Sequence, residues 1–262
     1  MFSKKGIQML GIGLVFIMLM TVGGSSQAEK VTDLSQLDGK VFAVPAGTVA
    51  DQLVLSKLPK ATFQYYDSAL DACLAVKAGK ADAAAYDEPI LKNIAAKNPG
   101  LIVLPDMITT DDYGFAVKLS QQELKNAIDK VVVELRNNGK YDEMLNYWLP
   151  KEGAPGDMPN IVLTGDKGVL KFGTAAVTEP FSFIDGSQQV VGFDIELAML
   201  IAQELGMQLE VVNLDFGGMI PALTAGKVDM IGACITITEE RAKTVLFSEP
   251  YYTGGIAALV RE

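Results

Sequence analysis

The stretch GACITITEER, residues 232–241, carries the most specific local chemistry in this chain. It begins as a small and apolar run, which predicts a buried strand that leads into a loop. Thr238 can then cap a short helix that carries Arg241. An arginine fork held beside a hydroxyl and free backbone N–H groups suits a carboxylate. On local chemistry alone, a solvated helix start with a surface arginine explains the pattern about as well.

Strand and helix signals alternate on both sides of this stretch, which is typical of an α/β protein with mostly parallel sheets. Short apolar runs predict the strands, and segments of helical periodicity that end at glycine or proline predict the helices. Strands are expected at 41–44, 62–66, 83–86, 170–173, 209–212 and 228–231. Helices are expected at 49–58, 69–78, 88–99, 121–138, 141–149, 193–205 and 219–225.

A weak internal repeat links the two halves of the chain. KAGKAD at 77–82 and TAGKVD at 224–229 each end a predicted helix at a glycine and open a strand. Convergent helix-stop chemistry is one explanation. Two similar βαβ lobes that face each other across a cleft are the other, and such a cleft is a common ligand site.

Composition narrows the function. The 262 residues carry a formal net charge of −10 and contain no histidine. An acidic chain is a poor candidate for nucleic-acid binding. The lack of histidine removes the commonest general base and the commonest metal ligand but leaves carboxylate and lysine chemistry open. We expect no metal, no cofactor and no enzymatic activity. Cys73 and Cys234 make no disulfide framework, and each is expected to pack as a small hydrophobic residue.

The N-terminal residues 1–28 fit a secretory signal peptide. Lys4 and Lys5 form a basic region, an apolar run follows over 9–22, and Ser26-Gln27-Ala28 offers small residues for cleavage. A membrane anchor is the alternative, but the apolar run is short for a membrane span. We therefore expect cleavage after Ala28 and a periplasmic protein.

Several motifs, taken together, resemble one family. GACITITEER and the following FSEPYY at 247–252 resemble the family 3 solute-binding proteins of polar amino-acid ABC transporters. Other motifs that do so are EPFSF at 179–183, GFDIEL at 192–197, DFGGMIPAL at 215–223, GT at 47–48, DEP at 87–89, YGFAV at 113–117 and GKYD at 139–142. The resemblance implies a two-lobe, type II periplasmic-binding-protein-like α/β fold with a hinged cleft.

The resemblance also implies which residues hold the ligand's carboxylate. In the family, the arginine that matches Arg241 binds the α-carboxylate, assisted by the hydroxyl and N–H of the position that matches Thr236. From the opposite lobe, the loop that matches Gly47, Thr48 and Val49 adds backbone N–H groups at a helix N-terminus. Free N–H groups and the helix dipole both favour an anion there.

Further positions carry the rest of the implied ligand. The aspartate that matches Asp87 takes the α-ammonium, although the local sequence also fits an ordinary acid at a helix start. The backbone carbonyl near Cys234 can accept the ammonium as well. The aromatic residue that matches Phe216 lies against the ligand side chain, where core packing is the alternative. Thr178 stands where the family often has a stacking aromatic residue.

The order of the motifs differs from that of the family. Residues 170–262 resemble its first half and residues 30–150 its second half, so we predict a circular permutant. The predicted parts are lobe two, 29–110 with 254–262; lobe one, 111–253; and, within it, a linker at 150–168 that joins the ancestral termini. The crossings between lobes are expected near 109–113 and 251–254. Lys30 and Glu262 should then lie close together on the surface of lobe two.

Two departures from the family pattern bear on ligand choice. Ala175 replaces an acidic position that often meets a basic side chain, and Thr178 offers a hydroxyl but no aromatic face. A long cationic side chain would then be desolvated without a partner. These positions predict that uncharged amino acids bind more tightly than lysine, arginine or ornithine, with Glu179 as a nearby acid that complicates the prediction.

The leading hypothesis is a monomeric periplasmic receptor that binds an amino acid and delivers it to a membrane ABC permease. The family also resembles cyclohexadienyl dehydratases, so an arogenate- or prephenate-dehydratase-like enzyme on the same fold is one alternative. A ligand-sensing subunit that acts through a partner protein is another.

Overall fold

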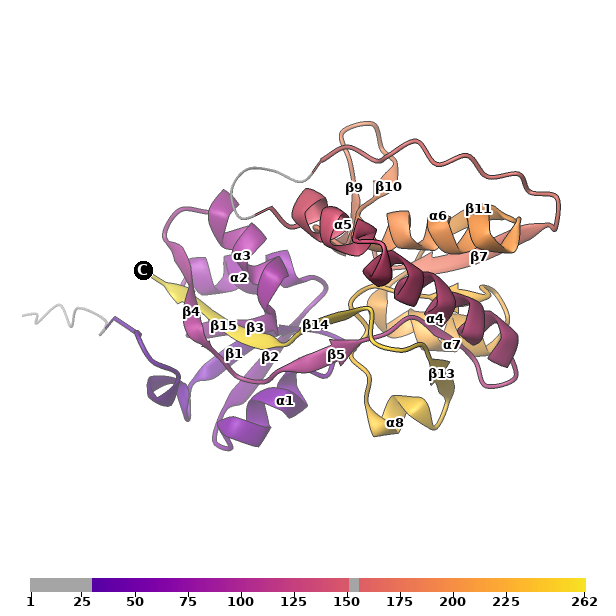
Figure 1. The fold of residues 1–262 in the computed structure, drawn as a ribbon. Helices are drawn as coiled ribbons and strands as arrows, with labels where there is room; N and C mark the ends of the chain where they lie inside the picture. The colour runs from indigo at the N-terminus through magenta and orange to yellow at the C-terminus, as the bar shows by residue number, and fades with distance from the viewer. Residues whose placement is uncertain (1–29, 151–155) are drawn as a thin grey trace, which may run out of the picture.

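A computed structural model describes residues 30–150 and 156–262. The predicted signal peptide, 1–28, and the linker positions 151–155 lie outside the described residues. Strands and helices alternate along the chain and form two lobes, each built on its own five-stranded sheet (Figure 1). The predicted two-lobe α/β fold is confirmed. No helix of the described ranges is long and apolar enough to cross a membrane.

Lobe two is built on the sheet β2-β1-β3-β15-β4. The strands are β1 (Val41–Pro45), β2 (Thr62–Tyr66), β3 (Ala83–Asp87), β4 (Leu101–Met107) and β15 (Ile256–Arg261). β1, β2 and β3 are parallel, whereas β15 runs antiparallel to both of its neighbours. β3 and β15 are buried along almost their whole length, as expected for central strands covered on both faces.

Helices cover both faces of this sheet. They are η1 (Leu34–Leu37), α1 (Ala50–Lys57), α2 (Ala69–Lys77) and α3 (Glu88–Lys97). α1 packs its buried residues with Phe42 and Val44 on one face, and α2 and α3 pack with Ala43 and Ala84 on the other. Alternating residues of one strand thus enter opposite cores, as the pleat of a strand requires.

Lobe one repeats this design in the sheet β11-β7-β12-β6-β13. The strands are β6 (Ala116–Lys118), β7 (Val169–Thr174), β11 (Gln208–Asn213), β12 (Met230–Ile231) and β13 (Val245–Phe247). β7, β11 and β12 are parallel, and β6 runs antiparallel to β12 and β13. Both lobes therefore have three parallel strands followed by one reversed strand.

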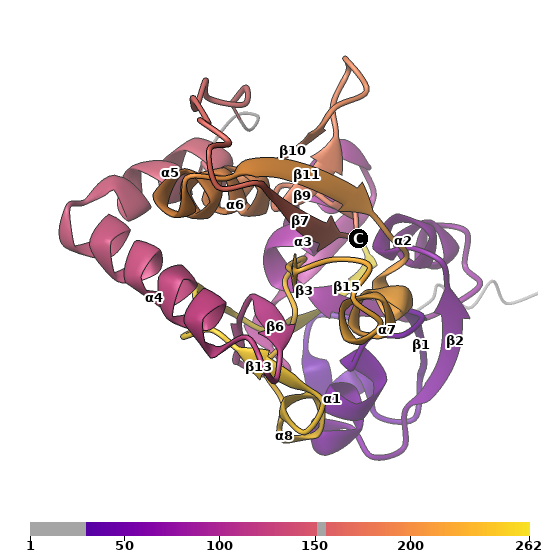
Figure 2. The same cartoon turned by 90° about the vertical axis from the view of Figure 1, so that its right-hand side faces the viewer.

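The helices of lobe one lie on both faces of its sheet. α4 (Gln122–Asn137), α5 (Lys140–Trp148) and α6 (Phe193–Leu205) cover one face, and α7 (Met219–Thr224) covers the other, as Figure 2 shows. The remaining elements are a small sheet of β8 (Val177–Thr178), β9 (Ser182–Ile184) and β10 (Val190–Val191), the turn η2 (Phe216–Gly218) and α8 (Glu239–Ala242).

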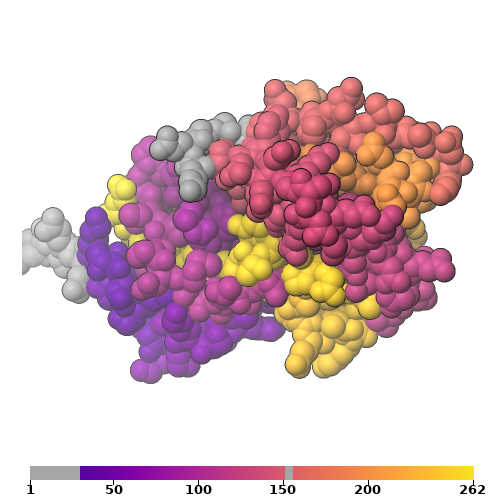
Figure 3. Space-filling view, in the orientation of Figure 1, coloured from indigo at the N-terminus to yellow at the C-terminus, as the bar shows by residue number. Residues whose placement is uncertain are grey.

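Two short strands cross between the lobes. β5 (Asp111–Tyr113) and β14 (Tyr252–Gly254) pair antiparallel, at the positions where the crossings were predicted. Each leads directly into the reversed strand of a sheet: β5 into β6, and β14 into β15. In the space-filling view of Figure 3 the yellow residues of the chain's last segment lie between the two lobes.

The internal repeat corresponds to matching structure in the two lobes. Gly79 and Gly226 both adopt a left-handed backbone, with φ of +74° and +73°, and end α2 and α7. The carboxylate of Asp82 then accepts a hydrogen bond from the Val41 N–H at 2.9 Å, and that of Asp229 accepts one from the Lys171 N–H at 2.9 Å. This agreement favours two similar lobes over convergent helix-stop chemistry.

The described part of the linker lies along lobe one (Figure 1). The side-chain amides of Gln203 and Gln208 donate to the carbonyl oxygens of Val162 and Leu163, each at 3.1 Å. In the same view the C-terminus and the start of the described chain both lie at the outer end of lobe two. The predicted domain boundaries themselves stay a prediction.

Candidate functional site

Two adjoining cavities lie where the loops of the two lobes meet. An inner cavity of about 10 Å³ and an outer cavity of about 570 Å³ share the lining residues Thr48, Tyr86 and Phe216. The outer volume falls in the range of small-molecule sites. The inner one has room for little more than a water molecule, so a ligand could enter it only if the lobes moved apart or side chains shifted.

The structure brings the predicted site residues together. Seven of the eight line the inner cavity: Thr48, Val49 and Asp87 from lobe two, and Phe216, Cys234, Thr236 and Arg241 from lobe one. The eighth, Thr178, lines the outer cavity. These residues come from loops that are up to about 190 positions apart in the sequence, so their convergence depends on how the lobes meet.

Arg241 is held by its own loop. The Thr238 hydroxyl accepts a hydrogen bond from the Arg241 N–H at 3.2 Å, which is the predicted helix cap. The guanidinium donates through Nη1 to the Thr236 carbonyl at 3.0 Å and lies 5.6 Å from the centre of the Phe216 ring. Burial lowers the pKa of Arg241. Arg241 is thus partly buried against its own loop, and the guanidinium keeps further N–H donors for an anion.

Asp87 supplies the opposite charge from lobe two. Only 2% of its surface is exposed, and its carboxylate accepts a hydrogen bond from the Tyr113 hydroxyl. Asp87 stands at the N-cap position of α3, the helix start that the alternative assumes, but its side chain makes no capping hydrogen bond. Burial raises the pKa of Asp87 to about 7, and the hydrogen bond from Tyr113 offsets part of that rise. A cation bound here would stabilise the ionised form.

The loop before α1 offers backbone donors, as predicted. Gly47 has a φ of +76°, which turns the chain out of β1. The Thr48 hydroxyl donates to the Pro45 carbonyl at 2.9 Å and accepts from the Ala50 N–H at 3.3 Å. Within the described ranges the N–H groups of Thr48 and Val49 form no hydrogen bond, so they remain available at this helix start.

Cys234 has a strained backbone in the wall of the inner cavity. It is buried, has a φ of +52°, and donates its N–H to the Tyr251 hydroxyl at 3.2 Å. Positive φ is uncommon for residues other than glycine and often occurs at functional sites. Both cysteines are buried and free, as the sequence predicted, and burial raises the pKa of Cys73 to about 12.

One buried acid near this point was not among the predicted site residues. Asp194, at the start of α6, is fully buried, and neither carboxylate oxygen has a hydrogen-bond partner of normal geometry among the described residues. Burial raises its pKa to about 8. Asp194 belongs to the GFDIEL motif, but no local pattern in the sequence predicts that its side chain is buried.

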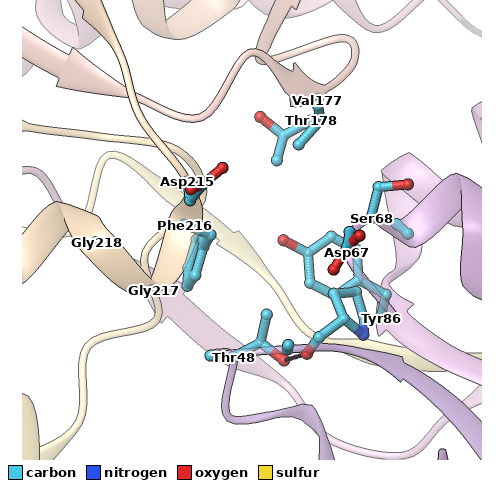
Figure 4. A pocket seen from close by; sticks show the side chains of 14 residues that line it. Thr48, Asp67, Ser68, Tyr86, Val177, Thr178, Asp215, Phe216, Gly217 and Gly218 are labelled. Atoms are coloured by element: carbon cyan, nitrogen blue, oxygen red, sulfur yellow. Dashed lines mark hydrogen bonds between the residues drawn. The ribbon is translucent and has the colours of Figure 1, made fainter. Parts of the chain in front are cut away.

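Two acids at the outer cavity were also not among the predicted site residues. Asp67 follows β2 in lobe two, and Asp215 precedes η2 in lobe one. Figure 4 shows both carboxylates on opposite sides of the cavity. Neither has an ion-pair or side-chain hydrogen-bond partner in the part of the chain that the structure describes. The signal that could have found them is their place directly after parallel strands, where α/β proteins hold ligands.

The expected hydroxyl of Thr178 does not face the cavity. Its Oγ1 lies 3.1 Å from the Ala175 carbonyl and 3.2 Å from the Ser182 carbonyl, in the turn between β8 and β9. Figure 4 shows this oxygen directed away from the cavity, so that carbon atoms form the wall. Ala175 itself is buried in lobe one and lines neither cavity.

The two lobes touch at both sides of the cavities. At one side a Cβ on Gly47 would lie only 2.8 Å from the Cα of Gly217, so the two backbones are in contact. At the other, the Lys97 ammonium lies 2.6 Å from the Glu179 carboxylate. Glu179 is thus engaged with Lys97 and does not line the outer cavity. Both contacts belong to a closed arrangement of the lobes.

The family match covers the C-terminal third of the chain, which provides Arg241. Residues 170–262 match the family described as bacterial extracellular solute-binding proteins, family 3. These residues are therefore similar to that family, which confirms the resemblance for this part of the chain.

Particular relatives agree with this class. The chain is 43% identical over 83 residues to a "Probable histidine-binding protein" of Campylobacter jejuni, which is 32% of each protein. It is 42% identical over 87 residues to the "Arginine-binding extracellular protein ArtP" of Bacillus subtilis, 33% of this chain and 34% of that one. The chain thus spans about a third of the length of these relatives.

A solved structure shows a similar local match. The arginine-bound form of domain 1 from TmArgBP is 43% identical, with 37% of this chain and 82% of that chain covered and a TM-score of 0.33. The relatives are named as binding proteins, and the family is named as extracellular.

Proposed function

We propose that this protein binds a free amino acid in the cleft between its lobes. One observation carries the proposal: a guanidinium from lobe one and a carboxylate from lobe two, Arg241 and Asp87, line the same cavity. An amino-acid zwitterion loses water at both of its charges in a closed cleft, so each charge must meet a partner. Arg241 would hold the α-carboxylate and Asp87 the α-ammonium.

The remaining inner residues complete this arrangement. The free N–H groups of Thr48 and Val49 would donate to the carboxylate, next to Thr236, and the backbone near Cys234 would assist at the ammonium. Phe216 would lie against the start of the side chain. Since the inner cavity holds only about 10 Å³, the ligand must enter an open form and be enclosed by a hinge motion at β5 and β14.

We further propose that the protein is a monomeric periplasmic receptor that delivers its ligand to a membrane ABC permease. The names of the relatives support an extracytoplasmic binding role, and the basic and apolar start of the chain supports export by a signal peptide cleaved after Ala28. Cell fractionation with N-terminal sequencing of the exported protein would test this. A full-length chain retained in the cytoplasm would contradict it.

We also propose that the chain is a circular permutant, with lobe two at 29–110 and 254–262, lobe one at 111–253 and the linker at 150–168. The matching strand orders of the sheets support this, as does the restriction of the family match to residues 170–262. A rearranged chain that starts at 169, continues from 262 through a short linker to 30, and ends at 150 should fold and bind the same amino acid. Failure of that chain to bind would contradict the proposal.

Binding rather than catalysis is proposed as the activity. Incubation with prephenate or arogenate tests the dehydratase alternative, because the formation of phenylpyruvate or phenylalanine would overturn the binding assignment. A thermal-shift screen of the twenty amino acids tests binding itself. A ligand that binds only the native state must raise the midpoint of unfolding, so a panel without any shift would contradict the proposed function.

A further inference from the structure

We propose that Tyr113, in the strand β5 that crosses between the lobes (Figure 1), is a positioning residue that aims the Asp87 carboxylate at the ammonium of the bound amino acid. This inference rests on the proposed function, because it gives a role in holding the ligand to a side chain that lines neither the inner nor the outer cavity. Tyr113 therefore acts on the ligand through Asp87 and without touching it.

The hydroxyl of Tyr113 connects the candidate ammonium site to the crossing strands. It donates to Oδ1 of Asp87, at the end of β3, and accepts a hydrogen bond from the Gly255 N–H at 3.0 Å. Gly255 lies between β14 and β15, so this second bond reaches the other crossing strand. A hydroxyl has a single donor and two acceptor sites. The donor is used on the carboxylate, and an acceptor site is used on the chain next to the hinge.

The main chain of Tyr113 is bonded to the loop that carries Arg241. Tyr113 forms an isolated antiparallel bridge with Thr236. Beside it, the Ile237 N–H donates to the Asp112 carbonyl at 2.8 Å. Arg241 in turn donates to the Thr236 carbonyl. The two proposed ligand anchors are thus joined through Tyr113, the lobe one anchor through its main chain and the lobe two anchor through its hydroxyl.

The ring of Tyr113 is held so that its hydroxyl stays in place. It is fully buried and stacks on Tyr252, with ring centroids 5.8 Å apart and an interplanar angle of 23°. On Gly254, a Cβ would lie only 2.8 Å from the Tyr113 hydroxyl, so the ring occupies the space that this glycine leaves. A close-packed ring has little freedom to change its rotamer, and such packing is what fixes a group that orients another.

Several groups set the charge of Asp87. Burial raises its pKa most, and the charge of Asp111 raises it further. Among the groups that lower this pKa, the hydrogen bond from Tyr113 has the largest effect, ahead of Arg241 and Tyr86. Loss of the Tyr113 hydroxyl must therefore raise the pKa of Asp87, in addition to freeing its carboxylate to turn. This effect on charge distinguishes a positioning role from a merely structural one.

The test is the conservative variant Tyr113→Phe, which removes the hydroxyl and keeps the ring. Calorimetric titration with L-arginine and with L-glutamine uses two ligands that share the same α-groups. At pH 7 the affinity for each should fall by about tenfold, as for the loss of a hydrogen bond to a charged group. The loss should become smaller toward about pH 8.5, where Asp87 is ionised in the variant as well. A loss below about twofold at pH 7, or one of equal size at every pH, would overturn the inference.

Tyr65→Phe is the matched control. The Tyr65 hydroxyl donates to the Asp51 carboxylate at 2.9 Å, but this tyrosine is 59% exposed and lines neither cavity. Its variant removes a similar hydrogen bond away from the site and should change affinity by less than about twofold. In an Asp87→Asn background, Tyr113→Phe should also cost less than about twofold, since its effect requires the carboxylate. Equal costs with and without the carboxylate would contradict the role of Tyr113.

A second variant moves the hydroxyl and keeps it. Gly254→Ala places a methyl group against the Tyr113 hydroxyl, and Gly254 does not have a positive φ, so its backbone accommodates alanine. We expect the same fall in affinity and the same dependence on pH as for Tyr113→Phe. Unfolding midpoints within a few degrees of wild type would show that both variants fold. An affinity within about twofold of wild type in both would contradict the inference.

A measurement without ligand separates this inference from the proposed function. An NMR titration of the Asp87 carboxyl carbon should have its midpoint at higher pH in Tyr113→Phe than in wild type. If amino acids bind the wild type and the midpoint is unchanged, the proposed function stands and the role of Tyr113 is wrong. If the midpoint moves but neither amino acid binds the wild type, the proposed function is wrong, and so is a positioning role toward an ammonium.

Discussion

The two lobes share one strand order but offer the cleft opposite charges. Lobe one provides Arg241, and lobe two provides Asp87 at the end of β3. The sheets are matched down to the Asp82 and Asp229 hydrogen bonds, so the difference arises in the loops that follow the strands. A duplicated scaffold can thus supply complementary halves of a zwitterion site through its loops alone.

The two halves of the zwitterion site also differ in whether their charge changes near neutral pH. The guanidinium of Arg241 stays protonated at any physiological pH, and it is held by the Thr236 carbonyl and the Phe216 ring. Asp87 titrates near neutrality, because burial raises its pKa to about 7. We therefore expect lobe one to provide a constant anchor and lobe two to provide a pH-dependent one.

Removal of the lobe one anchor should have the largest effect. Arg241→Ala leaves the bound carboxylate without its main partner, and loss of one partner of a desolvated charge pair costs about 2–5 kcal/mol. Calorimetry should show this loss at an unchanged unfolding midpoint. Lys243→Ala, two positions further and exposed, is the matched control. If Arg241→Ala kept an affinity within twofold of wild type, Arg241 would not be the anchor of the ligand carboxylate.

The lobe two anchor should produce a smaller effect that depends on pH. An ammonium binds only the ionised form of Asp87, so wild-type affinity should be full above pH 7 and fall by up to about tenfold for each unit below it. Asp87→Asn should lower affinity at pH 8 and remove this dependence. Asp194→Asn is the control, since Asp194 titrates near pH 8 but lies behind the site, and it should keep the loss of affinity below pH 7. A pH-independent wild type would contradict the assignment.

The contact between the lobes should tolerate a side chain on one side only. Gly47→Ala places a methyl group 2.8 Å from the Gly217 backbone and strains a φ of +76°, so it should hold the cleft open and weaken binding about tenfold. Gly217→Ala meets Gly47 at 3.6 Å, an ordinary contact, and should change affinity by less than about twofold. Equal effects of the two variants would show that the contact does not limit closure.

The ion pair across the cleft should matter least. Lys97 and Glu179 are 53% and 28% exposed, and such pairs contribute about 0.2–1 kcal/mol. Lys97→Ala should therefore weaken binding by less than about fivefold, and high salt should remove the difference from wild type. Lys92→Ala, one turn earlier on α3, is the control. A large loss that persists in high salt would mean that Lys97 acts on the ligand.

The sequence predicted the features that depend on neighbouring residues alone, such as helices and their caps. Helical periodicity located α1 to α7, whereas short apolar runs located six of the fifteen described strands. Thr238 marked the cap of the helix with Arg241, and Gly79 and Gly226 marked matching helix ends. The roles of Arg241 and Asp87 came from the family resemblance, because an aspartate before a helix and an arginine after a threonine each have an ordinary local explanation.

Features that depend on contact between the lobes were not predictable. Asp67 stands in a turn before the Ser68 cap, where an acid is common. Its relation to Asp215 exists only because two loops about 150 residues apart meet across the cleft. The orientation of Thr178 depends on carbonyl groups of the turn between β8 and β9, and the closeness of Gly47 to Gly217 depends on how the lobes pack.

The position of β15 between β3 and β4 has a consequence for the nascent chain. β4 ends at Met107 and β15 begins at Ile256, so the ribosome makes all the strands of lobe one before it makes this central strand of lobe two. The sheet of lobe one needs no strand from this last segment of the chain. Until β15 emerges, β3 and β4 each lack a neighbour and expose an unpaired edge, where association with other chains begins. Chaperone capture during synthesis should therefore be directed at the first-made strands of the molecule.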